Sequence, residues 1–136
     1  MTRISEPVPR YQAAWLGLGW ILVLWVTVAS LVPGPSLPDV GVSDKLNHFV
    51  AYGTLAFVFV GALGRRRWPM VLAGLVVLGG ALELAQAMGS AGRTGEALDM
   101  VANVAGAAAG IALAAAVPGG WCRWVEDRIL PGRGRS

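Results

Sequence analysis

The sequence has few charged residues. Asp, Glu, Lys and Arg together make up 14% of the 136 residues, whereas 55% of the residues are hydrophobic. A soluble domain has about 25% charged residues, so this chain has too few charges to cover a water-soluble surface of its size. The same balance excludes a disordered chain, because disordered chains are poor in apolar residues. The composition therefore predicts an integral membrane protein and argues against a soluble enzyme.

Cysteine and histidine are each present only once, as Cys122 and His48. One cysteine excludes an intrachain disulfide and a thiolate zinc cluster. One histidine excludes a metal site with several histidine ligands. We therefore expect no cofactor and no dedicated metal site, while a generic oxygen-only site for a divalent cation at Glu83 and Asp99 stays open.

Four apolar segments are close to the roughly 20 residues that a helix needs to cross a membrane. The expected spans are residues 13–32, 46–64, 69–88 and 97–117. They predict an all-α membrane protein in which residues 13–117 form a four-transmembrane-helix bundle. Residues 1–12 precede this domain, and the basic tail 118–136 is either solvated or contains a short interfacial helix. A cleaved signal peptide at the first span is the weaker alternative, because a signal core has only about 7–15 apolar residues.

The basic residues predict the orientation of these spans. Lys45 and Arg93 are the only two of the 11 Lys and Arg residues outside the N-terminal segment, the turn at 65–67 and the C-terminal tail. Positive residues stay in the cytoplasm, so we expect both termini there, in a multi-pass protein of the bacterial cytoplasmic (inner) membrane. Because the basic residues flank apolar segments, the net charge of +3 is a topology signal, and no nucleic-acid partner is expected.

This topology brings the polar residues of the spans to the extracytoplasmic boundary. Asp44, Lys45, His48 and Tyr52 open the second span, Glu83 and Gln86 lie near the end of the third, Arg93 lies in the following loop, and Asp99 and Asn103 open the fourth. Asp44, His48 and Tyr52 recur at intervals of four residues, which places them on one face of a helix. All of these side chains are expected in the outer third of the membrane, at about 1.5 Å of rise per residue.

The fourth span carries a second pattern below its polar end. Asp99, Asn103, Gly106 and Gly110 share one face, and Gly106 and Gly110 form a pair of small residues that lets helix backbones approach closely. We therefore expect the fourth helix to be central, with its polar end pointing into the bundle. Gly61 lies on no such face, so a leucine there is expected to disturb folding less than one at Gly106 or Gly110.

In these residues the chain resembles the VanZ-like family of small bacterial membrane proteins. The resembling pattern is Asp44-Lys45-x-x-His48-Phe49-x-x-Tyr52, then Glu83-x-x-Gln86, then Arg93 followed by Asp99, Asn103, Gly106 and Gly110. It covers about half of the chain, and Gly95 stands where members often have an aromatic residue. The family is named for a protein associated with low-level resistance to teicoplanin. The resemblance implies a role in the cell envelope and specifies neither a reaction nor a substrate.

The polar residues allow several functions. In an enzyme, His48 would exchange protons, Glu83 and Asp99 would orient it, and Lys45 or Arg93 would bind an anionic head group. Asp44, Tyr52, Gln86 and Asn103 would complete the binding site. We expect recognition or modification of a cell-envelope lipid or lipid-linked saccharide, with the oligomeric state open. The alternatives are a small membrane transporter and a structural protein in which Glu83, Arg93 and Asp99 only clamp the helices.

Overall fold

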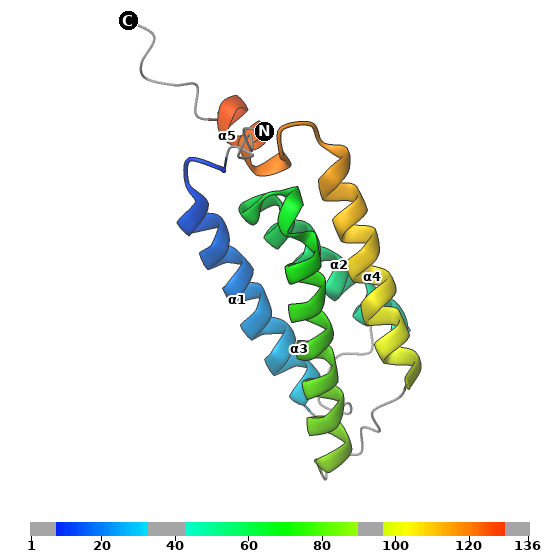
Figure 1. Cartoon of the computed structure of the whole chain (residues 1–136). Coiled ribbons are helices and arrows are strands. Elements are labelled where there is room, and N and C mark those ends of the chain that lie inside the picture. The colour runs from blue at the N-terminus through cyan, green and yellow to red at the C-terminus, as the bar shows by residue number, and fades with distance from the viewer. Residues whose placement is uncertain (1–7, 33–42, 90–96, 130–136) are drawn as a thin grey trace, which may run out of the picture.

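The computed structural model describes residues 8–32, 43–89 and 97–129, and within these ranges the chain is helical and contains no strand. Four long helices lie side by side, and a short fifth helix lies across one end of them (Figure 1). The elements are α1 (Gln12–Leu31), α2 (Asp44–Leu63), the 3-10 turn η2 (Arg65–Arg67), α3 (Trp68–Met88), α4 (Ala97–Ala116) and α5 (Trp121–Ile129). The ends of the four long helices differ from the predicted spans by at most two residues.

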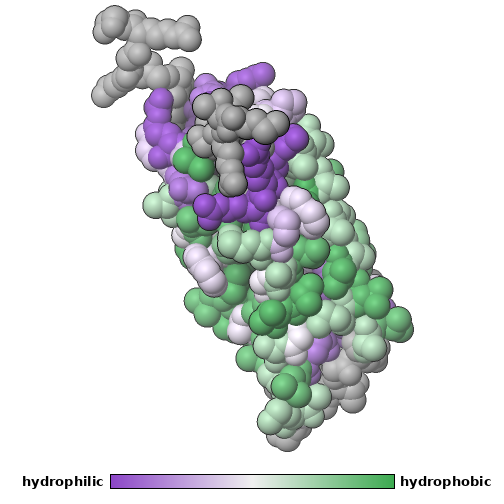
Figure 2. Space-filling view, viewed as in Figure 1, coloured by the Kyte–Doolittle hydropathy of each residue, from purple (hydrophilic) through white to green (hydrophobic). Residues whose placement is uncertain are grey.

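The helices α1 to α4 are each long and apolar enough to cross a membrane, as the sequence predicts. Their outer faces carry large exposed hydrophobic side chains, including Trp25, which is 67% exposed, and Val77, which is 71% exposed. In Figure 2 a hydrophobic middle lies below a strongly hydrophilic end. Exposed apolar surface of this kind is what a lipid-facing bundle presents, so the chain has the architecture of a multi-pass membrane protein.

Local sequence signals set the ends of the helices. Ser43 precedes α2, and its hydroxyl accepts a hydrogen bond of 3.2 Å from the backbone N–H of Leu46, which satisfies one of the free donors of the first turn. Gly64 ends α2 with a φ of 88°, a backbone conformation that residues with a side chain rarely adopt. Pro69 then lies in the first turn of α3, where its missing N–H costs no helical hydrogen bond.

The helix α2 is the central element. It packs against α1, α3, α4 and α5, and its most extensive contact is with α4. The expectation that the fourth helix is central is therefore wrong, because α4 packs mainly on α2 and α3. The expectation for its polar end is confirmed, since Asp99 and Asn103 are both buried on the face that meets the bundle.

Glycines make the contact between α2 and α4 close. A Cβ atom added at Gly106 would overlap the backbone oxygen of Phe49, and one added at Gly110 would overlap the backbone oxygen of Gly53. Gly53 in turn has the backbone oxygen of Gly106 only 3.1 Å from the position of a Cβ atom. The two backbones are thus in direct contact, which is the role predicted for the glycine pair of the fourth span.

Gly61 is also closely packed, by a contact that the sequence did not suggest. The indole of Trp121, from α5, occupies the space that a Cβ atom at Gly61 would need. This indole is fixed: its Nε1 donates a 2.9 Å hydrogen bond to the backbone oxygen of Phe57, and its ring stacks on the Phe57 ring at 4.5 Å. The contact comes from a residue 60 positions later that no helical periodicity connects to Gly61, and the milder effect expected of Gly61→Leu relative to Gly106→Leu stays a prediction.

Glu126 of α5 holds the beginning of α1. Its carboxylate accepts hydrogen bonds from the backbone N–H groups of Arg10 and Tyr11, at 2.7 and 2.9 Å, and from the indole Nε1 of Trp15, at 2.9 Å. Burial alone would raise the pKa of Glu126, but the hydrogen bonds from Tyr11, Trp15 and Arg10 outweigh burial and lower it below its usual value. We call this arrangement the α1–α5 clasp.

Candidate functional site

The polar residues predicted from the sequence gather where α2 and α4 begin. The helix α4 begins at the end of the bundle away from α5 (Figure 1). Asp44 and His48 come from the first turns of α2, and Asp99 comes from the first turn of α4. Each offers one oxygen or nitrogen atom, and these three atoms lie within 4.8 Å of one another. We call this group the Asp–His–Asp cluster.

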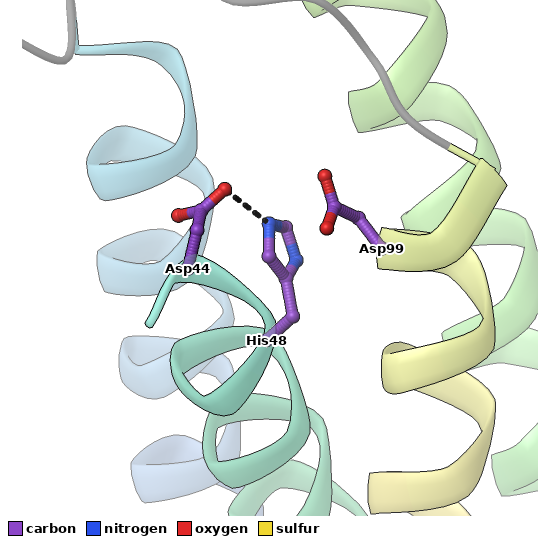
Figure 3. A group of neighbouring side chains, drawn as sticks. All are labelled: Asp44, His48 and Asp99. Atoms are coloured by element: carbon purple, nitrogen blue, oxygen red, sulfur yellow. Dashed lines mark ion pairs between the residues drawn. The ribbon is translucent and has the colours of Figure 1, made fainter. Parts of the chain in front are cut away.

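The imidazole of His48 lies between the two carboxylates (Figure 3). His48 and Asp44 are four residues apart on one face of α2, and Nε2 of His48 lies 3.7 Å from Oδ2 of Asp44. The side chain of His48 is only 10% exposed, whereas that of Asp44 is 51% exposed. The cluster therefore has a solvent-facing side at Asp44 and a buried side at Asp99.

Asn103 fixes the orientation of the imidazole. Its amide oxygen lies 3.0 Å from Nδ1 of His48, and an amide oxygen can only accept a hydrogen bond. In this arrangement Nδ1 carries a hydrogen and donates it to Asn103, and Nε2 faces the carboxylate of Asp44. Asn103 is buried one turn below Asp99 on the same face of α4, so a rigid helix pair holds the ring.

Asp99 is a buried carboxylate with incomplete compensation. Its side chain is 7% exposed, and its Oδ1 atom accepts no hydrogen bond from the described residues. The ammonium nitrogen of Lys45 lies 3.8 Å from this oxygen, which is an ion-pair distance but too long for a hydrogen bond. Removing a carboxylate from water costs several kcal/mol of free energy unless close partners replace the water. A hydrogen-bond donor or a cation bound at Oδ1 of Asp99 would therefore be strongly stabilised.

Tyr52 and Asn103 lie one helical turn further into the bundle than His48 and Asp99. Both are almost fully buried, and both face Gly79 of α3. A Cβ atom at Gly79 would lie 3.1 Å from the amide nitrogen of Asn103 and 3.3 Å from the hydroxyl of Tyr52. The glycine therefore lets α3 close the site from the side, and Tyr52 contributes packing beneath the imidazole face of α2.

Two further predicted residues, Glu83 and Gln86, lie on α3. Glu83 lies on α3 and is not among the three residues that the cluster brings within 4.8 Å. Gln86 donates a 2.8 Å hydrogen bond to the backbone oxygen of Ser30, which ties α3 to α1. Arg93 lies outside the described residues. The clamp expected from Glu83, Arg93 and Asp99 involves Arg93 and so stays a prediction, and the ion pair that the described residues show at Asp99 is with Lys45.

A cavity at the opposite end of the bundle was missed by the sequence analysis. It measures about 200 Å³, and Arg65, Arg123 and the backbones of Gly61, Gly64 and Gly120 line it. The sequence analysis treated these arginines only as topology signals. The α1–α5 clasp beside it was also missed, since only the isolated acid Glu126 in a basic tail hinted at it.

The Asp–His–Asp cluster combines the groups that proton transfer needs. Asn103 orients the imidazole, Nε2 is left for exchange with a bound group, and the carboxylates stabilise a positive charge on the ring. The same groups also offer one nitrogen and two oxygen ligands to a cation. Comparison of the chain with protein-family models, with curated proteins and with solved structures gave no match.

Proposed function

We propose that the Asp–His–Asp cluster is a binding site for the head group of a cell-envelope lipid or lipid-linked saccharide, with His48 as its proton-exchanging group. The observation that carries this proposal is the position of His48. A buried asparagine orients its ring at 3.0 Å, and its Nε2 faces the partly exposed carboxylate of Asp44 at 3.7 Å. Ionisable groups within membrane spans are costly and commonly mark functional sites.

The charges of the site favour a head group rich in hydroxyl groups. The two carboxylates of the cluster offer acceptors to the O–H groups of a sugar. Lys45 is 47% exposed at the rim and can pair with a phosphate that links such a sugar to its lipid. An anionic head group without a sugar would be repelled by the negative charges of the two carboxylates. The proposed ligand is therefore a saccharide at the membrane boundary, with its lipid chain in the bilayer.

The setting that we propose is the outer face of the bacterial cytoplasmic membrane. The distribution of Lys and Arg along the sequence supports this orientation, with both termini in the cytoplasm. We also propose that the chain is VanZ-like, on the strength of the sequence pattern from Asp44 to Gly110. A link to susceptibility to teicoplanin-type glycopeptides follows from that resemblance and is part of the proposal.

The test uses the conservative variant His48→Gln. Glutamine has a similar size and can keep a hydrogen bond with Asn103, but it cannot exchange a proton near neutral pH. The variant is purified in detergent beside the wild-type protein and beside Asp127→Asn, which changes an exposed acid of α5. Native mass spectrometry then measures which envelope lipids co-purify, and the glycopeptide susceptibility of strains carrying each variant is measured at equal membrane abundance.

We expect wild-type protein and Asp127→Asn to retain a saccharide-bearing lipid, and His48→Gln to lose it or to lose the susceptibility phenotype while its melting temperature is unchanged. Retention of both by His48→Gln would refute the proposal. A parallel loss of abundance and activity in every cluster variant would instead identify the cluster as a helix clamp. Saturable uptake of a solute by vesicles containing the purified protein would favour a transporter.

A further inference from the structure

The Asp–His–Asp cluster has the composition of a metal site. Asp44, His48 and Asp99 place one nitrogen and two oxygen atoms within 4.8 Å of one another. Ligands of a tetrahedral Zn²⁺ ion lie about 3.3 Å apart, given bonds of about 2.0–2.1 Å. The side chain of Asp44 is 51% exposed, so its oxygen has room to move toward that separation when an ion binds.

We propose that this cluster binds a divalent transition-metal ion of the zinc type, through Asp44, Nε2 of His48 and Asp99. This inference rests on the proposed function, because it assigns a ligand to the same residues. Two carboxylates and a neutral imidazole supply a charge of −2, which matches a divalent cation. Three protein ligands leave coordination positions open, as in zinc sites that bind water or a substrate oxygen.

The partner of His48 supports this assignment. A histidine that binds a metal through one ring nitrogen almost always donates its other N–H to an oxygen of the protein, which fixes the tautomer and the ring direction. Asn103 accepts that hydrogen bond from Nδ1 at 3.0 Å. The lone pair of Nε2 then faces the carboxylate of Asp44 at 3.7 Å (Figure 3), an arrangement that is unfavourable until a proton or a metal ion lies between them.

The state of Asp99 is an independent argument for a cation. Its side chain is more than nine-tenths buried, and its Oδ1 has no hydrogen-bond partner among the described residues. Among the described residues, the ammonium of Lys45 pairs with it at 3.8 Å and is on a half-exposed side chain that can turn to solvent. The ammonium of Lys45 therefore occupies part of the position that the metal ion would take. The ammonium and the metal ion compete for the carboxylate of Asp99.

This competition predicts that removal of the Lys45 charge increases the affinity for the metal ion. The purified full-length protein is treated with a chelator, and Co²⁺ is added while the visible absorption of the metal is recorded. Zn²⁺ affinity is then measured by competition with Co²⁺. We expect one ion per chain. His48→Gln and Asp99→Asn should weaken binding at least tenfold, Lys45→Gln should tighten it severalfold, and Asp127→Asn should leave it unchanged.

The outcomes separate this inference from the proposed function. Absence of a Co²⁺ spectrum in the folded wild-type protein, or equal affinity in His48→Gln and wild type, would overturn the metal site. Weaker binding in Lys45→Gln would also overturn the assignment of Lys45 as a competitor. Retention of the lipid by folded protein that gives no Co²⁺ spectrum would overturn the metal inference and leave the lipid site standing. A Co²⁺ spectrum from protein that never co-purifies with a lipid would support the metal inference and overturn the lipid site.

Discussion

Removal of the Glu126 carboxylate should open the α1–α5 clasp. In Glu126→Ala, three donors lose their acceptor at once, namely the backbone N–H groups of Arg10 and Tyr11 and the indole of Trp15. A hydrogen bond to a charged group contributes about 1.5–3 kcal/mol, and three such bonds to one carboxylate are not additive. Removing one partner of a buried charged interaction costs about 3–5 kcal/mol, and the solvent-facing edge of the clasp places Glu126 at the lower end, about 3 kcal/mol.

This free energy predicts the change in local opening. Since 1.4 kcal/mol corresponds to a factor of ten, the opening equilibrium of the clasp should increase by about 100-fold. Hydrogen–deuterium exchange of peptides that contain Arg10 and Tyr11 measures it directly, in detergent micelles or nanodiscs. Peptides from the middle of α2 should keep their protection, because they are buried in the centre of the bundle. Asp127→Ala, an exposed neighbour on the same helix, is the matched control and should change exchange less than threefold.

Acid should produce the same opening in the wild-type protein. The pKa of Glu126 is lower in the folded state than in the unfolded chain, because the hydrogen bonds from Tyr11, Trp15 and Arg10 outweigh burial. Its contribution to stability is therefore complete above the unfolded value of about 4.3 and is lost as the pH falls through the lower folded value. Exchange at the clasp that is unchanged in Glu126→Ala, or that responds equally to Asp127→Ala, would refute this account.

Three further predictions concern other parts of the chain. Gly106→Leu should reduce the free energy of unfolding by about 3 kcal/mol, the upper end for overpacking, and should lower the melting temperature in detergent. Gly17→Leu should have almost no effect, because nothing lies within 4 Å of the Cβ position at Gly17. Burial, with a smaller contribution from the charge of the nearby carboxylate, raises the pKa of Cys122 to about 12, so its thiol should resist alkylation by iodoacetamide at pH 8 until the protein is unfolded. In a Cys122→Ala background, a cysteine placed at Ser36 should react with a membrane-impermeant maleimide from outside intact cells and one placed at Arg66 should not; the opposite pattern would reverse the orientation.

The four spans could be predicted because each depends on a property of a continuous segment. A run of about 20 apolar residues specifies a membrane helix without reference to the rest of the chain. The burial of Asp99 and Asn103 could be predicted as well, since both lie on the helical face that carries Gly106 and Gly110. Periodicity assigns residues to one face of a helix, and small residues identify the face that packs.

Contacts between helices could not be predicted in the same way. Lys45 pairs with Asp99 across 54 positions, and Trp121 fills the space beside Gly61 across 60. Each of these contacts depends on the rotation and tilt of two helices, which hydropathy does not encode. The position of Glu126 shows the same limit, because its partners lie more than 100 residues earlier in the chain.

The α1–α5 clasp has a consequence for biosynthesis. A polypeptide is made from its N-terminus, so Arg10, Tyr11 and Trp15 leave the ribosome long before Glu126 is translated. During that interval the start of α1 has no carboxylate to accept its hydrogen bonds. The clasp can close only when α5 has been synthesised and has reached the same membrane face. Closure therefore requires that the intervening spans return the chain to the membrane face where α1 begins, and the loss of a single span would leave the clasp open.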